Sequence, residues 1–376
     1  MCSRQYNPGS SSRGMSPKKE VAMKHYIGVD FHKQFSFVSV MDTNGNIIEQ
    51  QQLSHLDVSG IRGFFSRFAP DASVSVEATR SWYWFVDLLQ DLGLPVNLVH
   101  PKKTRIIAES TIKTDKIDAS VLAHLDRCQF LPKAFIPDLQ SRSLRELLRY
   151  HLSLVKFRTA TKNKIHALLA KLNIHHSCSD LFGKAGRAFL HKLPLPDIFR
   201  LELNGYINLI DHLKESISAV ALVIQDSCSH SPLASRLFHV PGLGHFSALL
   251  LAAEIADIQR FPSFKKFCSY SGLAPSTRQS GSKIYHGRII KDSNSYIRYV
   301  LIEAVAHAIK KDNSLYWFYQ RIAKKRGTNK ARIATARKLA KIIYFMLSKN
   351  QDYYLNKTIL RSRVSPYTKL GTSLAR

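Results

Sequence analysis

The sequence predicts an α/β domain, then long helices, then a second and mainly helical domain. Three observations support this fold class. Short apolar segments bounded by turn residues fill the first part of the chain, and from about residue 140 apolar residues recur at the three-to-four spacing of helices. A chain of 376 residues is long enough for two or three domains. Its hydrophobic content of 45% fits a globular protein.

Residues 25–53 show the pattern of three strands. The first apolar run leads into Asp30, and the second begins at Phe35. Asn44 and Gly45 supply a hairpin turn before the third run. We therefore expect three consecutive strands at the start of the sheet.

Helices and strands then alternate. We expect a helix around residues 61–68, a strand "SVSVEA" that ends at Glu77, a helix at about 81–92, and a strand "VNLVH". A further helix contains "KTDKIDA", residues 113–119. Three antiparallel strands followed by alternating α and β elements is the order of an RNase H-like domain.

Four carboxylates fall at the ends of these elements. Asp30 ends the first strand, Glu77 ends a later one, and Asp115 and Asp118 are three residues apart, with Cβ atoms about 5–6 Å apart on one helix face. Singly, each acid is explained as a surface residue, and an isolated DxxD is explained as a solvated helix face. Together, the four could hold two Mg²⁺ ions about 4 Å apart, one for the attacking oxygen and one for the leaving oxygen.

The formal net charge of +28 indicates a polyanionic partner, most often nucleic acid. Residues 321–376 carry fifteen lysines and arginines against the single acid Asp352. A ribosome-like or merely adhesive surface is the alternative, because charge alone does not identify the partner. The long-helix region adds a basic stretch beside its apolar seam, and we expect phosphate contacts there from Lys156, Arg158, Lys162 and Lys164.

Several protein classes are disfavoured. The chain has no apolar run of about 18 residues that would span a membrane. Residues 1–22 lack the apolar centre of a signal peptide, and we expect a flexible basic arm there. Five scattered cysteines without a CxxC favour a reducing cytoplasm over a disulfide framework or a zinc knuckle. "HHSCSD" at 175–180 has no second ligand cluster to match it, so we expect an ordinary loop.

Residues 239–255, "HVPGLGHFSALLLAAEI", form a Pro-Gly-x-Gly turn that enters an apolar helix. This is typical of a helix-hairpin-helix element, whose turn glycines let backbone N–H groups approach a phosphate. A buried helical hairpin explains Gly242 and Gly244 equally well. The segment that follows, from "GLAPSTRQSG" to "HGRIIKDSN", is polar and basic, and we expect a loop.

The series "YIGVDFHK", "VSVEATRSWYW", "VHPKKTR", "KTDKIDASVLAHL", "VPGLG", "YSGLAPSTRQSG" and "HGRIIKDSN" resembles one transposase family. It comprises the DEDD insertion-sequence recombinases with a RuvC-like domain, including the pilin-gene invertase and the bridge-RNA-guided recombinases. The resemblance covers about residues 25–310. Arg80 and Ser293 depart from it where the family usually has Gly, and both could weaken local turns.

The resemblance implies that Asp30, Glu77, Asp115 and Asp118 bind the metal. It also implies that Ser280, in "QSG", is the nucleophile of the C-terminal domain, with Ser276 as the competing candidate. A phosphoserine link would retain the phosphoester bond energy for rejoining, which hydrolysis would discard. The loop around Ser280 could neutralise the phosphate through Arg278, Lys283, Arg288 and Lys291.

The resulting organisation has five segments. They are a basic arm (1–22), a RuvC-like catalytic domain (23–139), a coiled-coil-like helical linker (140–235), a C-terminal transposase domain (236–320) and a basic helical tail (321–376). The resemblance implies a Mg²⁺-dependent DNA transposase or site-specific recombinase, located in the cytoplasm with the nucleoid. It further implies a homo-oligomer, a dimer or a tetramer, whose acid site and serine come from different subunits, and a guide RNA encoded by the element's flank.

Two other functions stay open. A hydrolytic RuvC-like nuclease, such as a junction resolvase, would need the four acids but not Ser280. A nucleic-acid-binding protein derived from an inactive transposase would need neither.

Overall fold

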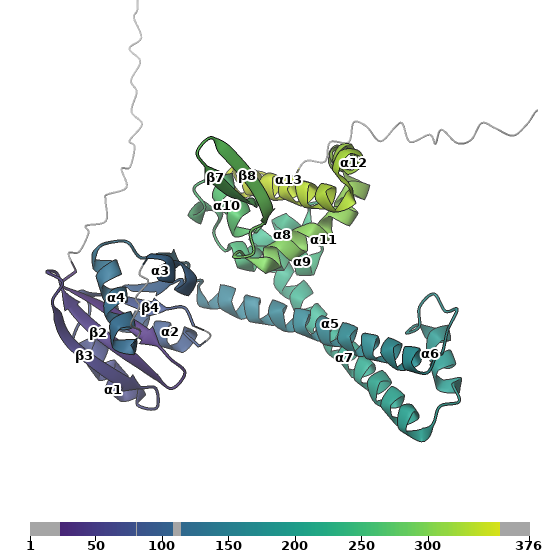
Figure 1. Ribbon diagram of the computed structural model, residues 1–376, viewed down its shortest axis with the longest axis horizontal. Helices are drawn as coiled ribbons and strands as arrows, with labels where there is room; N and C mark the ends of the chain where they lie inside the picture. The colour runs from purple at the N-terminus through teal and green to yellow at the C-terminus, as the bar shows by residue number, and fades with distance from the viewer. Residues whose placement is uncertain (1–22, 80, 108–113, 354–376) are drawn as a thin grey trace, which may run out of the picture. The chain divides into compact units, whose positions relative to one another are not determined.

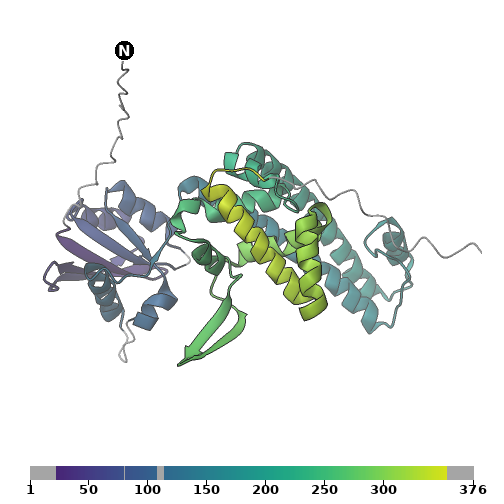
Figure 2. The same ribbon diagram turned by 90° about the horizontal axis from the view of Figure 1, so that it is seen from above.

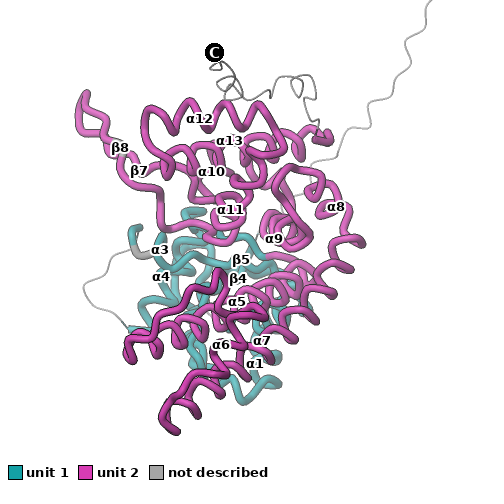
Figure 3. Tube along the Cα trace, turned by 90° about the vertical axis from the view of Figure 1, so that its right-hand side faces the viewer, with its two compact units in different colours: residues 1–136 teal, residues 137–376 magenta. Residues whose placement is uncertain are grey.

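The computed structural model describes residues 23–79, 81–107 and 114–353. These residues form two compact units, divided between Ile136 and Pro137 (Figure 3). Unit 1 is the part up to Ile136, and unit 2 is the part from Pro137. The predicted divisions after residues 235 and 320 stay predictions. The expected basic arm lies outside the described residues, as do Arg80, Lys113 and residues 354–376.

Unit 1 is built on a mixed sheet with the strand order β3-β2-β1-β4-β5-β6 (Figure 1). β1 to β3 are antiparallel, β4 and β5 run parallel to β1, and β6 is antiparallel to β5. The α/β class and the three opening strands are therefore confirmed. The strands are β1 His25–Phe31, β2 Phe35–Asp42, β3 Ile47–Ser54, β4 Ala72–Glu77, β5 Val96–Val99 and β6 Lys133–Ala134.

The two faces of this sheet differ in chemistry. Because side chains alternate along a strand, Ile27 and Val29 of β1 lie on one face, and Gly28 and Asp30 lie on the other. The first face is apolar and packs against α1 and α2. The second face is polar and receives α4. The helices are α1 Val58–Ser66, α2 Tyr83–Asp91, α3 Pro101–Ile107 and α4 Asp115–Arg127.

Unit 2 begins with two helices of 33 residues each, α5 Leu139–Lys171 and α7 Asp197–Ser229. They pack along each other, and the tip of the pair is closed by α6 Lys184–Lys192 over a small apolar cluster that includes Ile165 and Leu203 (Figure 1). The predicted long helices are confirmed. No helix in the described ranges is both long enough and apolar enough to cross a bilayer.

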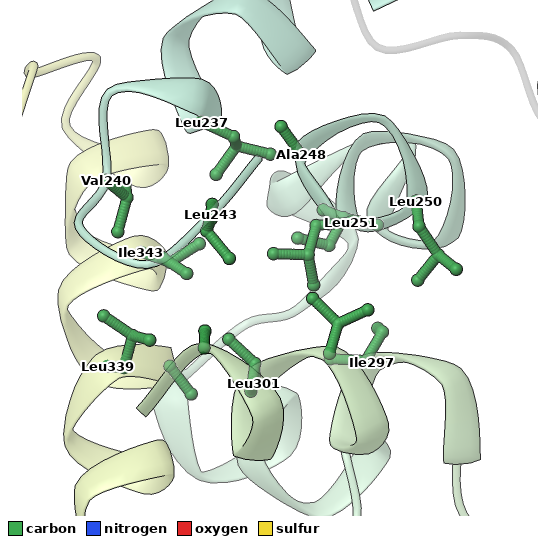
Figure 4. Close-up of a cluster of buried hydrophobic side chains, with 14 of the residues drawn as sticks. Leu237, Val240, Leu243, Ala248, Leu250, Leu251, Ile297, Leu301, Leu339 and Ile343 are labelled. Atoms are coloured by element: carbon green, nitrogen blue, oxygen red, sulfur yellow. The ribbon is translucent and has the colours of Figure 1, made fainter. Parts of the chain in front are cut away.

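The rest of unit 2 is a helical bundle around one apolar core. Figure 4 shows Leu243, Leu251 and Leu301 meeting Leu339 and Ile343 in this core. The last two belong to α13, so one face of this helix within the expected basic tail is part of the core, and deleting the tail would expose the core. The helices are α8 Pro232–Phe238, α9 His245–Ile255, the 3₁₀ helix Ile258–Arg260, α10 Phe264–Tyr270, α11 Ser295–Lys311, α12 Asn313–Arg326 and α13 Thr328–Ser348.

The turn between α8 and α9 owes one of its glycines to packing. Gly242 has φ +88°, and a Cβ there would lie 2.3 Å from the carbonyl oxygen of Ala304 in α11. Gly244 has ordinary backbone geometry and open space around it. Close packing of the turn on α11 therefore accounts for Gly242 without a phosphate. The helix-hairpin-helix interpretation stays a prediction.

The polar segment that we expected to be a loop forms a β-hairpin instead. β7 Pro275–Ser280 pairs antiparallel with β8 Lys283–Ile289, and Figure 2 shows the pair extending from the helices of unit 2. The prediction was wrong because both faces of the ribbon are exposed to solvent. Such a ribbon carries no alternation of apolar and polar residues, which is the signal that a half-buried strand gives.

Ser293, one of the two departures from the family pattern, has a structural role. Its hydroxyl donates to the carbonyl of Ile290 and lies 3.1 Å from Nη1 of Arg298. It also fills the space beside Gly272, where an added Cβ would lie 2.2 Å from the Ser293 oxygen. The serine therefore ties the end of the hairpin to α11, contrary to the expected weakening of the turn.

Candidate functional site

The candidate site of unit 1 depends on the close approach of α4 to β1. A Cβ at Gly28 would lie 1.9 Å from the carbonyl oxygen of Ala119 and 2.6 Å from the amide nitrogen of Ala123. No other residue type leaves room for the helix backbone there. Asp30 follows two residues later on the same face of the strand, so the contact at Gly28 brings the start of α4 to Asp30.

Hydrogen bonds fix α4 at its middle. The hydroxyls of Ser39 in β2 and Ser120 in α4 lie 3.1 Å apart, and Gln50 of β3 donates to Ser120 at 2.8 Å. These contacts join the middle of the helix to the antiparallel half of the sheet.

The C-terminal half of α4 is fixed by a buried carboxylate. Asp126 is only 5% exposed and accepts hydrogen bonds from Ser73 at 2.7 Å and Ser75 at 2.8 Å. Asn97 donates to the same carboxylate from β5. A buried carboxylate with these donors is satisfied, so Asp126 anchors the helix and is not a free ligand.

The four predicted acids lie at one end of this arrangement. Glu77 follows Val76, whose partner in β1 is Val29, the residue before Asp30. Asp30 and Glu77 are therefore neighbours on adjacent parallel strands and point to the same face. Asp115 and Asp118 occupy the first turn of α4, where acids are favoured by the helix dipole.

His32 joins the acids and was missed in the sequence. Its Nε2 lies 3.1 Å from Oδ2 of Asp30 and 3.2 Å from Oδ1 of Asp115, so one imidazole bridges strand and helix. The alternation of strands could have found it, because a residue two after Asp30 falls on the same side of the chain. The string "YIGVDFHK" contains this signal.

The site is electrostatically strained. Burial raises the pKa of the Asp30 carboxyl above its ordinary value; His32 opposes this rise, and the carboxylates of Asp115 and Asp118 add to it. Asp30 is 6% exposed, which makes the loss of hydration large for an acid. Like charges have therefore been brought together, which is the condition that a bound cation relieves.

The donor set fits a divalent metal ion. One ligand atom each from Asp30, His32 and Asp115 lies within 4.8 Å of the others, and it is the one such group of three or more within the ranges that the structure describes. Two carboxylates and an imidazole suit ions that accept both oxygen and nitrogen ligands, and carboxylates with water suit Mg²⁺. The "HHSCSD" segment, within the same ranges, forms no comparable group.

Ser280 is the last residue of β7, at the tip of the exposed hairpin. Its strand partner is Lys283, and Gly281 follows with φ +56°. No hydrogen bond to the Ser280 hydroxyl occurs among the described residues. Ser276, the competing candidate, lies near the base of the hairpin, where its hydroxyl would be 2.4 Å from a Cβ at Gly287.

The basic residues predicted around Ser280 are on the same ribbon. Arg278 pairs with Tyr285, so Arg278, Ser280 and Lys283 share one face of the hairpin. Arg288 lies near the end of β8, and Lys291 follows the strand. All four basic residues are exposed. The hairpin therefore presents the Ser280 hydroxyl among cations.

The basic residues of α5 do not form a single stripe. At about 100° per residue, Lys156 and Lys164 are about 80° apart on one side of the helix, and Arg158 and Lys162 are about 40° apart on the other. Lys162 lies over the ring of Phe182 at 4.5 Å. Lys156 lines a groove of about 580 Å³ beside Tyr296 and Tyr299 of α11. The four basic residues predicted to contact phosphate therefore lie on two different sides of α5, and a single phosphate backbone would meet only two of them.

Comparison with known proteins gives two matches, in separate parts of the chain. A family model described as "Transposase" matches residues 27–174, and one described as "Transposase IS116/IS110/IS902 family" matches residues 234–320. The first contains the four acids, and the second contains Ser280.

Similar proteins match over most of their length. A "Probable family 20 transposase" of Pseudomonas aeruginosa is 26% identical over 345 residues, which is 87% of this chain and 98% of that protein. The transposase for insertion sequence element IS1111A of Coxiella burnetii is 25% identical over 72% of this chain and 76% of its own length. A pilin gene-inverting protein of Moraxella bovis is 28% identical over 69% and 74%. This chain belongs to the IS110/IS116 family of transposases.

Proposed function

We propose that the protein is a Mg²⁺-dependent DNA transposase or site-specific recombinase that mobilises an insertion sequence by DNA cleavage and strand exchange. One observation carries the proposal. A strand, a neighbouring strand and a helix bring Asp30, Glu77, Asp115 and Asp118 to one end of the polar sheet face, as an RNase H-like, RuvC-like nuclease site requires.

The acids have a defined role in this proposal. Asp30, Asp115, Asp118 and Glu77 would hold the divalent metal, or two ions if all four carboxylates take part. His32 contacts both Asp30 and Asp115 and so keeps these two carboxylates close together. When bound, the metal would activate an attacking oxygen and stabilise a leaving oxygen at the phosphorus. The buried position of Asp30 keeps water from competing for that carboxylate.

Ser280 supplies the second half of the chemistry. Its hydroxyl oxygen forms a bond to phosphorus while one strand's P–O bond breaks, so the number of phosphoester bonds is unchanged and rejoining needs no outside energy. The hairpin cations Arg278, Lys283, Arg288 and Lys291 hold the phosphate. Among the residues that the structure describes, the Ser280 hydroxyl has no hydrogen-bonded base, so we propose that its proton acceptor comes from the assembled complex.

We also propose an assembly of two or four copies that unites acids and serine from different subunits, and a guide RNA encoded by the element's flank. The high positive charge supports a large nucleic-acid surface of this kind. A hydrolytic nuclease is the second candidate, favoured by the absence of a hydrogen bond to the Ser280 hydroxyl among the described residues.

The test is a recombination assay with purified full-length protein, Mg²⁺, DNA carrying the element ends and target, and RNA transcribed from the flank. We expect joined products that need Mg²⁺ and flank RNA. A matched reaction with an RNA of scrambled sequence is the control. Products that form equally well with the scrambled RNA would contradict the proposal of a guide RNA. DNA that is cut but never joined would favour the hydrolytic nuclease.

A further inference from the structure

A groove of about 790 Å³ lies in unit 2 at the base of the hairpin that carries Ser280. One wall is the base of the β7–β8 hairpin with Pro275, Gly287 and Ile289, and the other is made by the end of α12 and the start of α13. The second wall lies beyond residue 320, where the matched family region ends. Its volume falls in the range of small-ligand sites, about 300–1,000 Å³.

The rim of the groove is cationic. Its charged lining residues are all basic and all exposed, and none takes part in an ion pair within the described ranges. Between residues 313 and 353 the one acid is Asp352, which pairs with Arg236. An anionic ligand would therefore meet no repulsion from the lining. The rim residues are Arg321, Lys325, Arg326, Lys330 and Arg337.

The floor of the groove is apolar. Leu273, Ile289, Ile322, Ile333 and Ala334 line it between the cations. Inorganic phosphate alone would leave these side chains facing water. A ligand that combines a flat apolar part with flanking phosphates matches both rim and floor, and an unpaired nucleotide has this composition.

The chain's own C-terminal segment does not suit the groove. Residues 354–376 contain five basic residues and no acid. Placed in the groove, they would add positive charge to a positive rim, and like charges repel.

We propose that this groove, termed the α12–α13 groove, binds an unpaired nucleotide of the DNA strand that is presented to Ser280. The inference rests on the proposed function. DNA is the proposed occupant because the groove lies close to Ser280 along one strand. β7 forms the groove wall at Pro275 and reaches Ser280 five residues later, about 17 Å along the strand, so a DNA strand at Ser280 could also reach the groove. Strand exchange requires bases to leave their pairs near the cut, and a base held here would keep the opened strand in place.

The experiment compares two DNA probes. One is a fluorescent duplex with three unpaired nucleotides at its centre, and the other is the same duplex fully paired. Affinities of the full-length protein are measured by anisotropy at one fixed salt concentration, without Mg²⁺, so that no cleavage is needed. We expect the wild type to bind the unpaired probe about tenfold more tightly.

Two variants address the groove by different routes. Ala334→Trp fills the groove without changing charge, and it should remove the preference while leaving affinity for the paired duplex within about twofold. Lys325→Gln with Lys330→Gln removes two rim cations at exposed positions that do not support the core. The matched control is Lys324→Gln with Lys341→Gln, the same charge change on the same helices outside the groove lining.

Each outcome decides the proposal. Loss of the preference in both groove variants, with the preference retained in the control, supports it. An unchanged preference in Ala334→Trp, or an equal loss in the control, overturns it. If Ala334→Trp weakens binding of an RNA of the same sequence but not of the DNA, the occupant is RNA and the proposal is wrong. A normal preference together with no recombination would count against the proposed function and not against the groove.

Discussion

The acid site of unit 1 and the serine hairpin of unit 2 are built in opposite ways. Asp30 is 6% exposed, lies under the start of a helix, and is joined to Asp115 by His32. Ser280 lies on a ribbon of two exposed strands that pair with each other alone among the strands of the described residues. An isolated two-stranded hairpin is marginally stable in water.

The difference indicates which half is preorganised. The acids are held in place by backbone contact and buried hydrogen bonds before any substrate arrives, so the like-charge repulsion is built into the fold. The serine lies on a two-stranded ribbon, and under the proposed function we expect it to gain a fixed position when DNA or another subunit packs against the hairpin. The predictions below separate these two modes.

The largest effect is expected from Gly28→Ala. The new Cβ would meet the backbone of α4 at 1.9 Å, which α4 can avoid only by moving away from the sheet. We expect destabilisation of unit 1 by about 1–3 kcal/mol or more and complete loss of cleavage. Thermal unfolding measures the first, and a strand-cleavage assay measures the second.

Gly63→Ala is the matched control for Gly28. Gly63 lies in α1 with nothing within 4 Å of an added Cβ, so the same substitution should stabilise the helix by about 0.5–1 kcal/mol. Equal behaviour of the two variants would show that α4 does not need close contact with β1.

Asp115→Asn and Asp118→Asn should each abolish strand cleavage and leave DNA binding nearly unchanged. The amide keeps the shape of the side chain but loses the charge that holds the metal. Cleavage and affinity are measured on the same protein preparation. Asp91→Asn, at an exposed acid of α2, is the control. Cleavage at the wild-type rate by either site variant would mean that "KTDKIDA" is only a solvated helix face.

A smaller effect is expected at the hairpin turn. Gly281→Ala places a side chain at φ +56°, which costs about 1–2 kcal/mol locally. We expect recombination to fall several-fold with an unchanged melting temperature, because the hairpin adds little to the core. Gly281→Asn should restore most of the activity, since Asn tolerates this conformation. A fall in melting temperature equal to that of Gly28→Ala would contradict the contrast between the halves.

The smallest effect is a pH-dependent stability change from Asp30→Asn. Burial raises the pKa of Asp30, so its ionised form is disfavoured in the folded state, and stability is lost as pH rises through the folded pKa. Without metal, the variant should melt at a higher temperature than the wild type at pH 7.5. The gain should disappear below the ordinary carboxyl pKa of 3.8, where both states are protonated.

Asp42→Asn is the opposite-sign control. The backbone N–H of Asn46 donates to Asp42 at 2.7 Å and lowers the pKa of that carboxyl. Its contribution to stability is present above 3.8 and is lost as pH falls, so this variant should melt lower at pH 7.5. A gain in both variants would mean that the effect at Asp30 is not electrostatic.

Much of unit 1 was predictable from its sequence. The strands alternate or run apolar, and "NG" marks the hairpin turn, so the order of helices and strands along the chain followed from pattern. The acids fall at element ends in the sequence as in the structure, and their role as metal ligands stays a prediction. The packing between them did not. Gly28 and Asp126 fix α4 through contacts with residues distant in the sequence, and a single chain shows no such pairing. His32 could have been predicted, because side chains alternate along a strand and His32 comes two residues after Asp30.

Unit 2 was less readable. The long helices α5 and α7 followed from spacing, but the hairpin gave no apolar alternation because both its faces meet solvent. The basic segment after residue 320 contained two signals at once, charge on one side of α13 and Leu339 and Ile343 on the other. The sequence analysis predicted a helix in this segment, but it did not predict that α13 closes the core and forms a wall of the α12–α13 groove.

The central claim is that the acids and Ser280 act together through a covalent protein–DNA link. The direct measurement stops the recombination reaction with denaturant and looks for DNA whose mobility is shifted by one protein chain. We predict an adduct in the wild type and in Ser276→Ala, and none in Ser280→Ala or Asp115→Asn. An adduct that survives in Ser280→Ala and vanishes in Ser276→Ala would move the nucleophile, and cut DNA without an adduct in any variant would contradict the account.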